Sequence, residues 1–85
     1  MEQYLNKLLQ ELKLRNYSPR TAESYLTCLK YYFYFLEKND ARIDELDEDL
    51  VKKFLLEKYH KKSSSQTINL YLNAIKFFYR EIISH

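Results

Sequence analysis

The sequence has no glycine at all, and it has only one proline and one cysteine among its 85 residues. A small β-rich domain needs glycine in its tight turns, because the favoured hairpin turns require positive φ angles. The absence of glycine therefore argues against a β-barrel or β-sandwich and favours long helices joined by short loops. It also excludes a glycine-rich loop that could cradle the phosphates of a nucleotide.

Groups that could form a disulfide, hold a metal or carry out catalysis are also scarce. Cys28 has no partner for an internal disulfide, and we interpret it as a small buried side chain. His60 and His85 are isolated, so no Cys/His set has the spacing of metal ligands. None of the nine tyrosines has an evident base beside it, and packing in a core explains most of them. We therefore expect no cofactor, no metal and no enzymatic activity.

Long apolar runs are missing as well. No stretch approaches the roughly 18 apolar residues of a membrane span, and the first residues do not form a signal-peptide pattern. Together with the single cysteine, this predicts a soluble, cytoplasmic protein without a membrane partner. The length fits one small domain, which buries only about 60–65% of its unfolded surface.

The total charge is close to balanced, at +2, but it is distributed unevenly. Six of the twelve acidic residues crowd the segment 40–49, where Arg42 is the only basic residue. The rest of the chain then has 13 basic and 6 acidic residues, a surplus of seven positive charges. A polyanion could bind one side of such a domain with the acidic segment turned away, although ordinary solvated helix faces would give the same counts.

The most informative feature that is present is a repeat. Residues 18–33 can be aligned with residues 64–79. Five positions are identical, and they are Ser18/Ser64, Thr21/Thr67, Tyr25/Tyr71, Leu26/Leu72 and Lys30/Lys76. Three further positions hold an aromatic residue in both copies. Each copy is typical of a helix that begins with a hydroxyl cap, continues as an apolar stripe and ends in aromatic residues.

Apolar periodicity predicts an all-α domain with four helices, over about 2–15, 19–38, 48–60 and 65–83. Ser18 and Asp47 are the expected N-caps of the second and third helices, and Ser64 or Ser65 caps the fourth. The predicted core takes large apolar side chains from every helix. These are Leu8, Leu12, Leu26, Leu29, Phe33, Phe54, Ile75 and Phe78.

Two groups of apolar side chains are not explained by one buried face per helix. Residues 31–36 are apolar on all sides, which predicts cover from more than one direction. Leu70, Ala74 and Phe77 form an additional stripe on the fourth helix. We expect this stripe to pack either on the first helix or on something outside this chain.

The fourth helix also carries a polar stripe that suits nucleic acid. Its members recur at spacings of three and four, so they share one helix face. They are Gln66, Asn69, Asn73, Lys76 and Arg80. Amide side chains can bond adenine, and long cations can bond guanine or phosphate. An ordinary solvent-exposed face remains the alternative interpretation.

The starts of the second and fourth helices are candidate phosphate sites, because free backbone N–H groups and the helix dipole favour anions there. On the second helix the start offers Arg20 and Thr21. A stripe that matches the polar stripe of the fourth helix adds Thr27 and Lys30 as candidates, and its members are Arg20, Glu23, Thr27, Lys30 and Tyr34. Around the start of the fourth helix they are Lys61, Lys62, Ser64, Ser65 and Thr67. Plain helix capping explains part of this pattern, and Glu23 opposes a surface devoted wholly to phosphate.

Three segments of the chain resemble a known family. In this order, Asn16 to Tyr25, Ile43 to Val51 and Ser65 to Tyr79 resemble the N-terminal core-binding domain of tyrosine recombinases, which include the Xer recombinases and phage or integron integrases. Leu70 and Lys76 stand where that family often has arginine. Lysine can hold a phosphate but lacks the bidentate fork of arginine, which puts base-specific contact from Lys76 in doubt.

The resemblance implies an orthogonal, SAM-like bundle that grips one face of the duplex core site as half of a clamp. The implied parent cuts and rejoins DNA with a separate catalytic domain, so residues 1–85 are expected to be a single core-binding domain excised from a larger recombinase and non-catalytic by themselves. The implied partners are double-stranded DNA, the catalytic domain of the same parent chain and neighbouring recombinase protomers. The isolated domain is expected to be monomeric. The alternative function is a helical protein–protein interaction module without DNA binding.

Overall fold

The computed structural model describes residues 2–84. Its helices are α1 (Glu2–Leu14), α2 (Pro19–Lys38), α3 (Glu48–His60) and α4 (Ser65–Phe77), and α4 continues directly into the π-helix η1 (Phe78–Ile83). No strand occurs in this part of the chain. The predicted all-α fold with four helices is confirmed, and the predicted bounds are right to within one residue except at the π-helical end.

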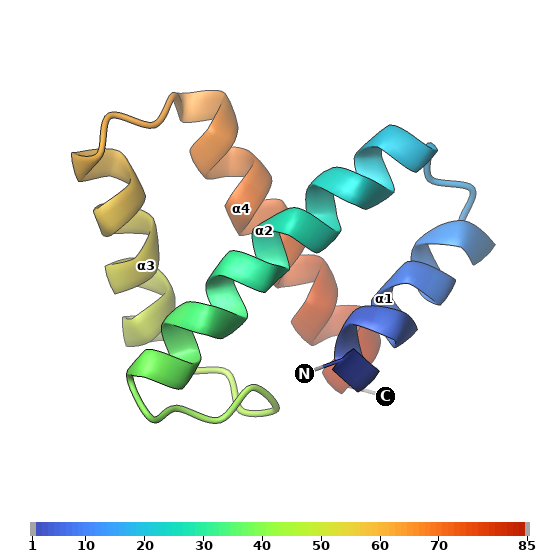
Figure 1. Cartoon of the computed structure of the whole chain (residues 1–85), viewed down its shortest axis with the longest axis horizontal. Coiled ribbons are helices and arrows are strands. Elements are labelled where there is room, and N and C mark those ends of the chain that lie inside the picture. The colour runs from blue at the N-terminus through green and yellow to red at the C-terminus, as the bar shows by residue number, and fades with distance from the viewer. Residues whose placement is uncertain (1, 85) are drawn as a thin grey trace.

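The helices cross around a single core, with α2 at its centre (Figure 1). In this view α2 runs across the front, α4 crosses behind it, and α3 and α1 flank the crossing on the left and right. Helix α2 packs on α1, α3 and α4. Leu8, Phe33, Phe54 and Phe78 are almost completely buried where these elements meet.

The repeat in the sequence produces a nearly symmetric contact between the α2 and α4–η1 segments. Tyr32 and Phe33 align with Phe78 and Tyr79 in the two copies. Phe33 packs edge-on against Phe78 with ring centroids 5.1 Å apart, and Tyr32 packs against Tyr79 at 6.3 Å. Each first ring thus contacts the second ring of the other copy, as a two-fold relation requires. The Tyr32 and Tyr79 hydroxyls lie 3.2 Å apart, so these buried polar groups satisfy each other.

Three consecutive aromatic side chains, Phe77 to Tyr79, are all buried. They span more than half of the circumference of an α-helix. We predicted one α-helix as far as residue 83, but the chain changes to a π-helix at Phe78. The wider π turn shifts the following side chains around the helix axis. Ile82 and Ile83 consequently also pack against the core, and η1 packs on α1.

Three helices end in the left-handed conformation that usually selects glycine, although this chain has none. Asn16, Asp40 and Lys62 have φ angles of 60°, 52° and 64°. In each case the next amide donates to the carbonyl oxygen five residues earlier, at 3.0, 2.9 and 3.1 Å respectively. This is the Schellman arrangement of a helix end. Lys62 is the least suited of the three, because asparagine and aspartate tolerate this conformation better than lysine does.

Replacing Lys62 by glycine is therefore expected to stabilise the domain by about 0.5–1 kcal/mol, because glycine has no Cβ to clash in the left-handed region. Thermal unfolding should show a midpoint a few degrees higher. Lys61→Gly is the matched control, since Lys61 has a φ of −83° and gains nothing from glycine. A lower midpoint for Lys62→Gly than for the wild type would contradict this explanation of the helix end.

Most of the predicted core is buried, with one correction. Leu26 is only partly buried, because it lies at the edge of the α2 face that is centred on Leu29 and Tyr32. The expected cover of residues 31–36 from more than one direction is confirmed, since rings of this segment pack on rings of α1, α3 and η1. Tyr31 and Tyr34 are the exposed members of the segment. The Nζ atoms of Lys58 and Lys38 lie 5.3 and 4.7 Å from the ring centroids of Tyr31 and Tyr34, and such cations are attracted to the ring faces.

The additional stripe on α4 packs inside this chain. Ala74 and Phe77 are buried, and Leu70 is partly buried against the core. The Phe77 ring lies 5.6 Å from the Tyr17 ring and 5.9 Å from the Tyr25 ring. The cover thus comes largely from the α1–α2 connection and the start of α2. The stripe consequently does not provide the exposed surface that an interaction module would use.

Candidate nucleic-acid interface

The two copies of the repeat build the same N-terminal cap on α2 and on α4. Ser18 Oγ accepts a hydrogen bond from the Thr21 amide at 3.2 Å, and Ser64 Oγ accepts one from the Thr67 amide at 3.1 Å. In both caps the serine hydroxyl also donates to the threonine Oγ1 at 3.0 Å. Ser64 is therefore the cap of α4, and Ser65 takes the first helical position.

Capping uses some of the hydroxyl groups that the sequence offers to an anion, but not all of them. In each cap the serine hydroxyl donates its hydrogen to the threonine Oγ1, so it cannot also donate to an anion. The threonine hydroxyl accepts this hydrogen bond and can still donate its own hydrogen to another acceptor. Thr21 and Thr67 are both half-buried, so their hydroxyl groups lie close to the surface. The Thr21 and Thr67 amides are held by the caps, and Pro19 has no N–H. The first-turn amides that remain are that of Arg20 on α2 and those of Ser65 and Gln66 on α4. Each helix start can therefore offer one threonine hydroxyl and at least one backbone N–H to a phosphate.

Both helix starts lie along the same edge of the molecule, which is the upper edge in Figure 1. The α3–α4 connection, which contains Lys61 and Lys62, runs along this edge as well. The side chains of Arg20, Lys61 and Lys62 are exposed. The positive ends of two helix dipoles and three cations thus share one edge. We call this edge, formed by residues 18–21 and 61–67, the capped edge.

A shallow hollow of about 400 Å³ lies between the first halves of α2 and α4. Three predicted site residues line it, namely Arg20, Thr27 and Thr67. Glu23 lines the same hollow and places a carboxylate beside these groups. The hollow therefore joins the two copies of the repeat, and Glu23 is its acidic member.

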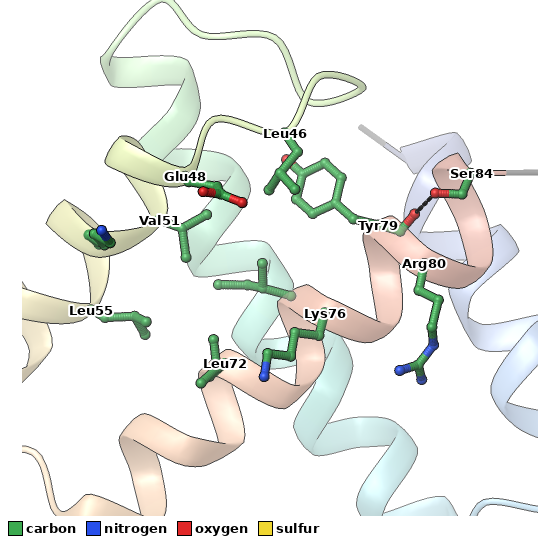
Figure 2. Close-up of a pocket in the computed structure, with 11 residues that line it drawn as sticks. Leu46, Glu48, Val51, Leu55, Leu72, Lys76, Tyr79, Arg80 and Ser84 are labelled. Carbon is green, nitrogen blue, oxygen red and sulfur yellow. Dashed lines mark hydrogen bonds between the residues drawn. The ribbon is translucent and has the colours of Figure 1, made fainter.

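The polar stripe of α4 is exposed along its whole length. Both a nucleic-acid-binding face and an ordinary solvent-exposed face require this. Lys76 and Arg80 lie at the far end of the stripe from the cap, on the rim of a groove between α3 and α4 (Figure 2). Arg80 Nε donates to Glu81 Oε1 at 2.8 Å, which partly neutralises its charge. Gln66, Asn69 and Asn73 lie nearer the capped edge.

The corresponding stripe on α2 does not join the stripe on α4. The two helices pack on each other through their buried faces, so their exposed faces turn away from each other. Lys30 lies on the exposed face of α2, beyond the hollow that contains Arg20 and Thr27. The structure thus places both helix starts on one edge, at its two ends, and separates Lys30 from Lys76, its equivalent in the repeat.

The acidic segment lies at the opposite edge of the molecule, below the crossing helices in Figure 1. Part of its charge is used locally. Asp47 Oδ1 accepts from the Asp49 and Leu50 amides at 3.0 and 3.2 Å, as its predicted role as N-cap of α3 requires. The Arg42 guanidinium binds Asp44 through two hydrogen bonds of 3.0 and 2.9 Å and lowers the pKa of that carboxyl. The negative charge of this segment consequently lies far from the capped edge.

The thiol of Cys28 and the hydroxyls of Tyr32 and Tyr79, which could act as nucleophiles, belong to buried side chains. Burial raises the pKa of the Cys28 thiol to about 11, so the thiol stays protonated at neutral pH. Burial likewise raises the pKa values of Tyr32 and Tyr79, and their shared hydrogen bond lies inside the core. Within residues 2–84, no cluster of three or more His, Cys, Asp or Glu side chains could hold a metal, and no helix could span a membrane. His85 lies outside the described residues.

Two basic residues, Lys52 and Arg15, make contacts between elements but were not among the predicted DNA-binding residues. Lys52 lies on the α3 side of the groove that Lys76 and Arg80 border. Arg15 donates to Glu81 Oε2 at 2.6 Å and lies 5.6 Å from the Phe77 ring centroid, so it holds η1 against the end of α1. Helical periodicity alone does not show either contact, because both join elements that are far apart in the chain.

Comparison with known proteins identifies the family. A family model described as the phage integrase N-terminal SAM-like domain matches residues 4–85. No curated protein and no solved structure gives a match. The matched range covers almost the whole chain and includes every helix except the first two residues of α1. The chain therefore belongs to the family of N-terminal SAM-like domains of phage integrases.

Proposed function

We propose that this domain binds duplex DNA through the capped edge and acts as the non-catalytic half of the clamp of a tyrosine recombinase. The single observation that carries the proposal is the placement of two identically capped helix starts on one edge, together with Arg20, Lys61 and Lys62. Phosphate groups are recognised by such donors and cations. The acidic segment at the opposite edge supports the same orientation on a polyanion.

The family supports a division of labour between this domain and a second one. In our proposal residues 1–85 act as one core-binding domain, while a catalytic domain in the same parent chain closes around the other face of the DNA and carries the chemistry. Neighbouring protomers on the same DNA are further partners, and the cytoplasm is the proposed location. The protonated, buried state of Tyr32, Tyr79 and Cys28 supports a domain without catalysis of its own.

Binding to a fluorescein-labelled duplex at increasing salt tests this proposal. Half a clamp with about four to six phosphate contacts should bind non-specifically, with a Kd on the order of 10⁻⁴–10⁻⁶ M at physiological salt. The logarithm of the binding constant should fall with the logarithm of salt concentration with a slope of about −4 to −5. Binding that does not depend on salt, or no binding at low salt, would reject the proposal in favour of an interaction module.

Glu23→Gln is expected to tighten duplex binding by about two- to fivefold at low salt, because it removes a negative charge beside Arg20 and Thr67 in the hollow. Fluorescence anisotropy measures the change. Glu37→Gln is the matched control, since it removes the same charge from α2 near the acidic edge and should have little effect. Equal effects of the two substitutions would show that only total charge matters and would contradict a site at the hollow.

A further inference from the structure

A groove between α3 and α4 lies outside the proposed DNA-binding edge. Its main part has a volume of about 590 Å³. Figure 2 shows Val51, Leu55 and Leu72 around the space between the two helices. A second hollow of about 400 Å³ shares Leu55 with it and continues past Leu56 and Ile68 toward the end of α3. Lys52 and Leu55 line both hollows, and we call the two hollows along α3 together the α3–α4 groove.

Large apolar side chains beside this groove are exposed to solvent. The exposed fractions are 52% for Leu46, 55% for Leu56 and 64% for Tyr59. Helix α3 therefore has two apolar faces, since Val51 and Phe54 already supply the one that is buried in the core. A contiguous exposed apolar surface of this kind marks an interaction site in soluble proteins.

The rim of the groove is mostly basic. Lys52 borders it on α3, Lys76 borders it on α4, and Arg80 borders it on η1. Glu48 is the only acidic residue among the side chains that line the main part. Within residues 2–84, neither Lys52 nor Lys76 takes part in a salt bridge. The charges of these two lysines are thus available to an acidic partner on either side of an apolar floor.

We propose that the α3–α4 groove binds an amphipathic helix of a partner protein, with an apolar face flanked by acidic side chains. The apolar floor is unsuited to DNA, whose outer surface is charged phosphate, and the basic rim selects acidic flanks. A groove between two packed helices accepts the ridge of a third. The eleven-residue interval from Glu48 to Tyr59 corresponds to about 17 Å, so about three turns of the partner helix can be accommodated. This inference does not depend on DNA binding.

A fluorescein-labelled synthetic peptide provides the test. The probe is a helical peptide of about four turns with leucine along one face, at the spacing of an amphipathic helix, and glutamate on both flanks. We expect binding in the micromolar range, as for a small interface. In a titration of the labelled domain, the signals of Leu55, Leu72 and Ile75 should move. A peptide with lysine in place of every glutamate should bind at least about tenfold more weakly.

Leu56→Gln should weaken peptide binding by about tenfold, because it places a polar group in the α3–α4 groove. Leu14→Gln is the matched control, since Leu14 is 79% exposed on α1 and should leave peptide binding unchanged. Neither substitution changes the charge, so duplex DNA binding should stay within about twofold for both. Failure of DNA binding in the wild type would thus be separable from failure of this proposal.

Three results would overturn the inference. Equal affinity for the glutamate and lysine peptides would show that the basic rim does not favour acidic flanks in the partner helix. An unchanged peptide affinity for Leu56→Gln would show that the groove is not the binding site. Sedimentation of the domain as a dimer that Leu56→Gln converts to a monomer would assign the groove to a second copy of this chain instead.

Discussion

Replacing Phe33 by alanine is expected to lower the free energy of unfolding by about 3–5 kcal/mol, because the change leaves a large cavity in the core. Phe33 is fully buried, and its ring lies 5.1 Å from that of Phe78 and 6.5 Å from that of Tyr4. It therefore joins α1, α2 and η1. A domain of 85 residues has a total stability of only about 4–13 kcal/mol. Urea denaturation followed by circular dichroism measures the loss.

Tyr34→Ala is the control for this substitution. Tyr34 is the next residue of α2 and also aromatic, but it is exposed and touches Lys38 rather than the core. Its truncation should cost less than about 1 kcal/mol, as most surface substitutions do. A Phe33→Ala variant as stable as the wild type, or a Tyr34→Ala variant equally damaged, would show that the buried face of α2 is wrongly assigned.

Neutralising the two lysines of the α3–α4 connection is expected to weaken duplex binding on the order of tenfold near physiological salt, equally for all sequences, because point charges bind phosphate and not bases. The variant is Lys61→Gln combined with Lys62→Asn. Asparagine is chosen at position 62 because it tolerates the left-handed φ of 64° there. The slope of binding against salt should fall by about two, one for each lysine.

The matched control neutralises two lysines at the acidic edge. Lys38 ends α2, and Lys53 Nζ lies 3.5 Å from Asn39 Oδ1 beside the acidic segment. Lys38→Gln combined with Lys53→Gln makes the same change in net charge and should reduce the salt slope by much less than one. If both pairs weakened binding alike, the DNA would not be held by the capped edge.

The helices and their starts could be predicted from the sequence because their signals are local. A serine or aspartate before an apolar stripe, with threonine or acidic residues in the first turn, is sufficient to place the starts of α2, α3 and α4. The serine and threonine that the two repeat copies share explain why α2 and α4 have equivalent caps. Whether the predicted residues bind DNA stays a prediction, since capping and phosphate binding use the same hydroxyl groups.

Features that depend on contacts between distant elements could not be predicted in this way. The π-helix at Phe78 arises from three rings that must all be buried against other elements. The α3–α4 groove arises from the distance between two helices, which periodicity does not give. Periodicity also placed Lys30 and Lys76 in equivalent stripes, but packing turns those stripes away from each other. The left-handed conformation at the ends of α1, α2 and α3 could not be predicted, because the residues there are not glycine.

Duplex DNA titrated into the isotope-labelled domain, followed by the chemical shifts of its backbone amides, shows whether the capped edge binds DNA. We predict shifts at Arg20 and Thr21 and across Lys62 to Thr67, with smaller ones along Asn69 and Asn73. The acidic segment 40–49 should stay unchanged, and the shifts should disappear as salt is raised. Shifts confined to the acidic segment or to the α3–α4 groove, or no shifts at low salt and millimolar protein, would contradict DNA binding by the capped edge.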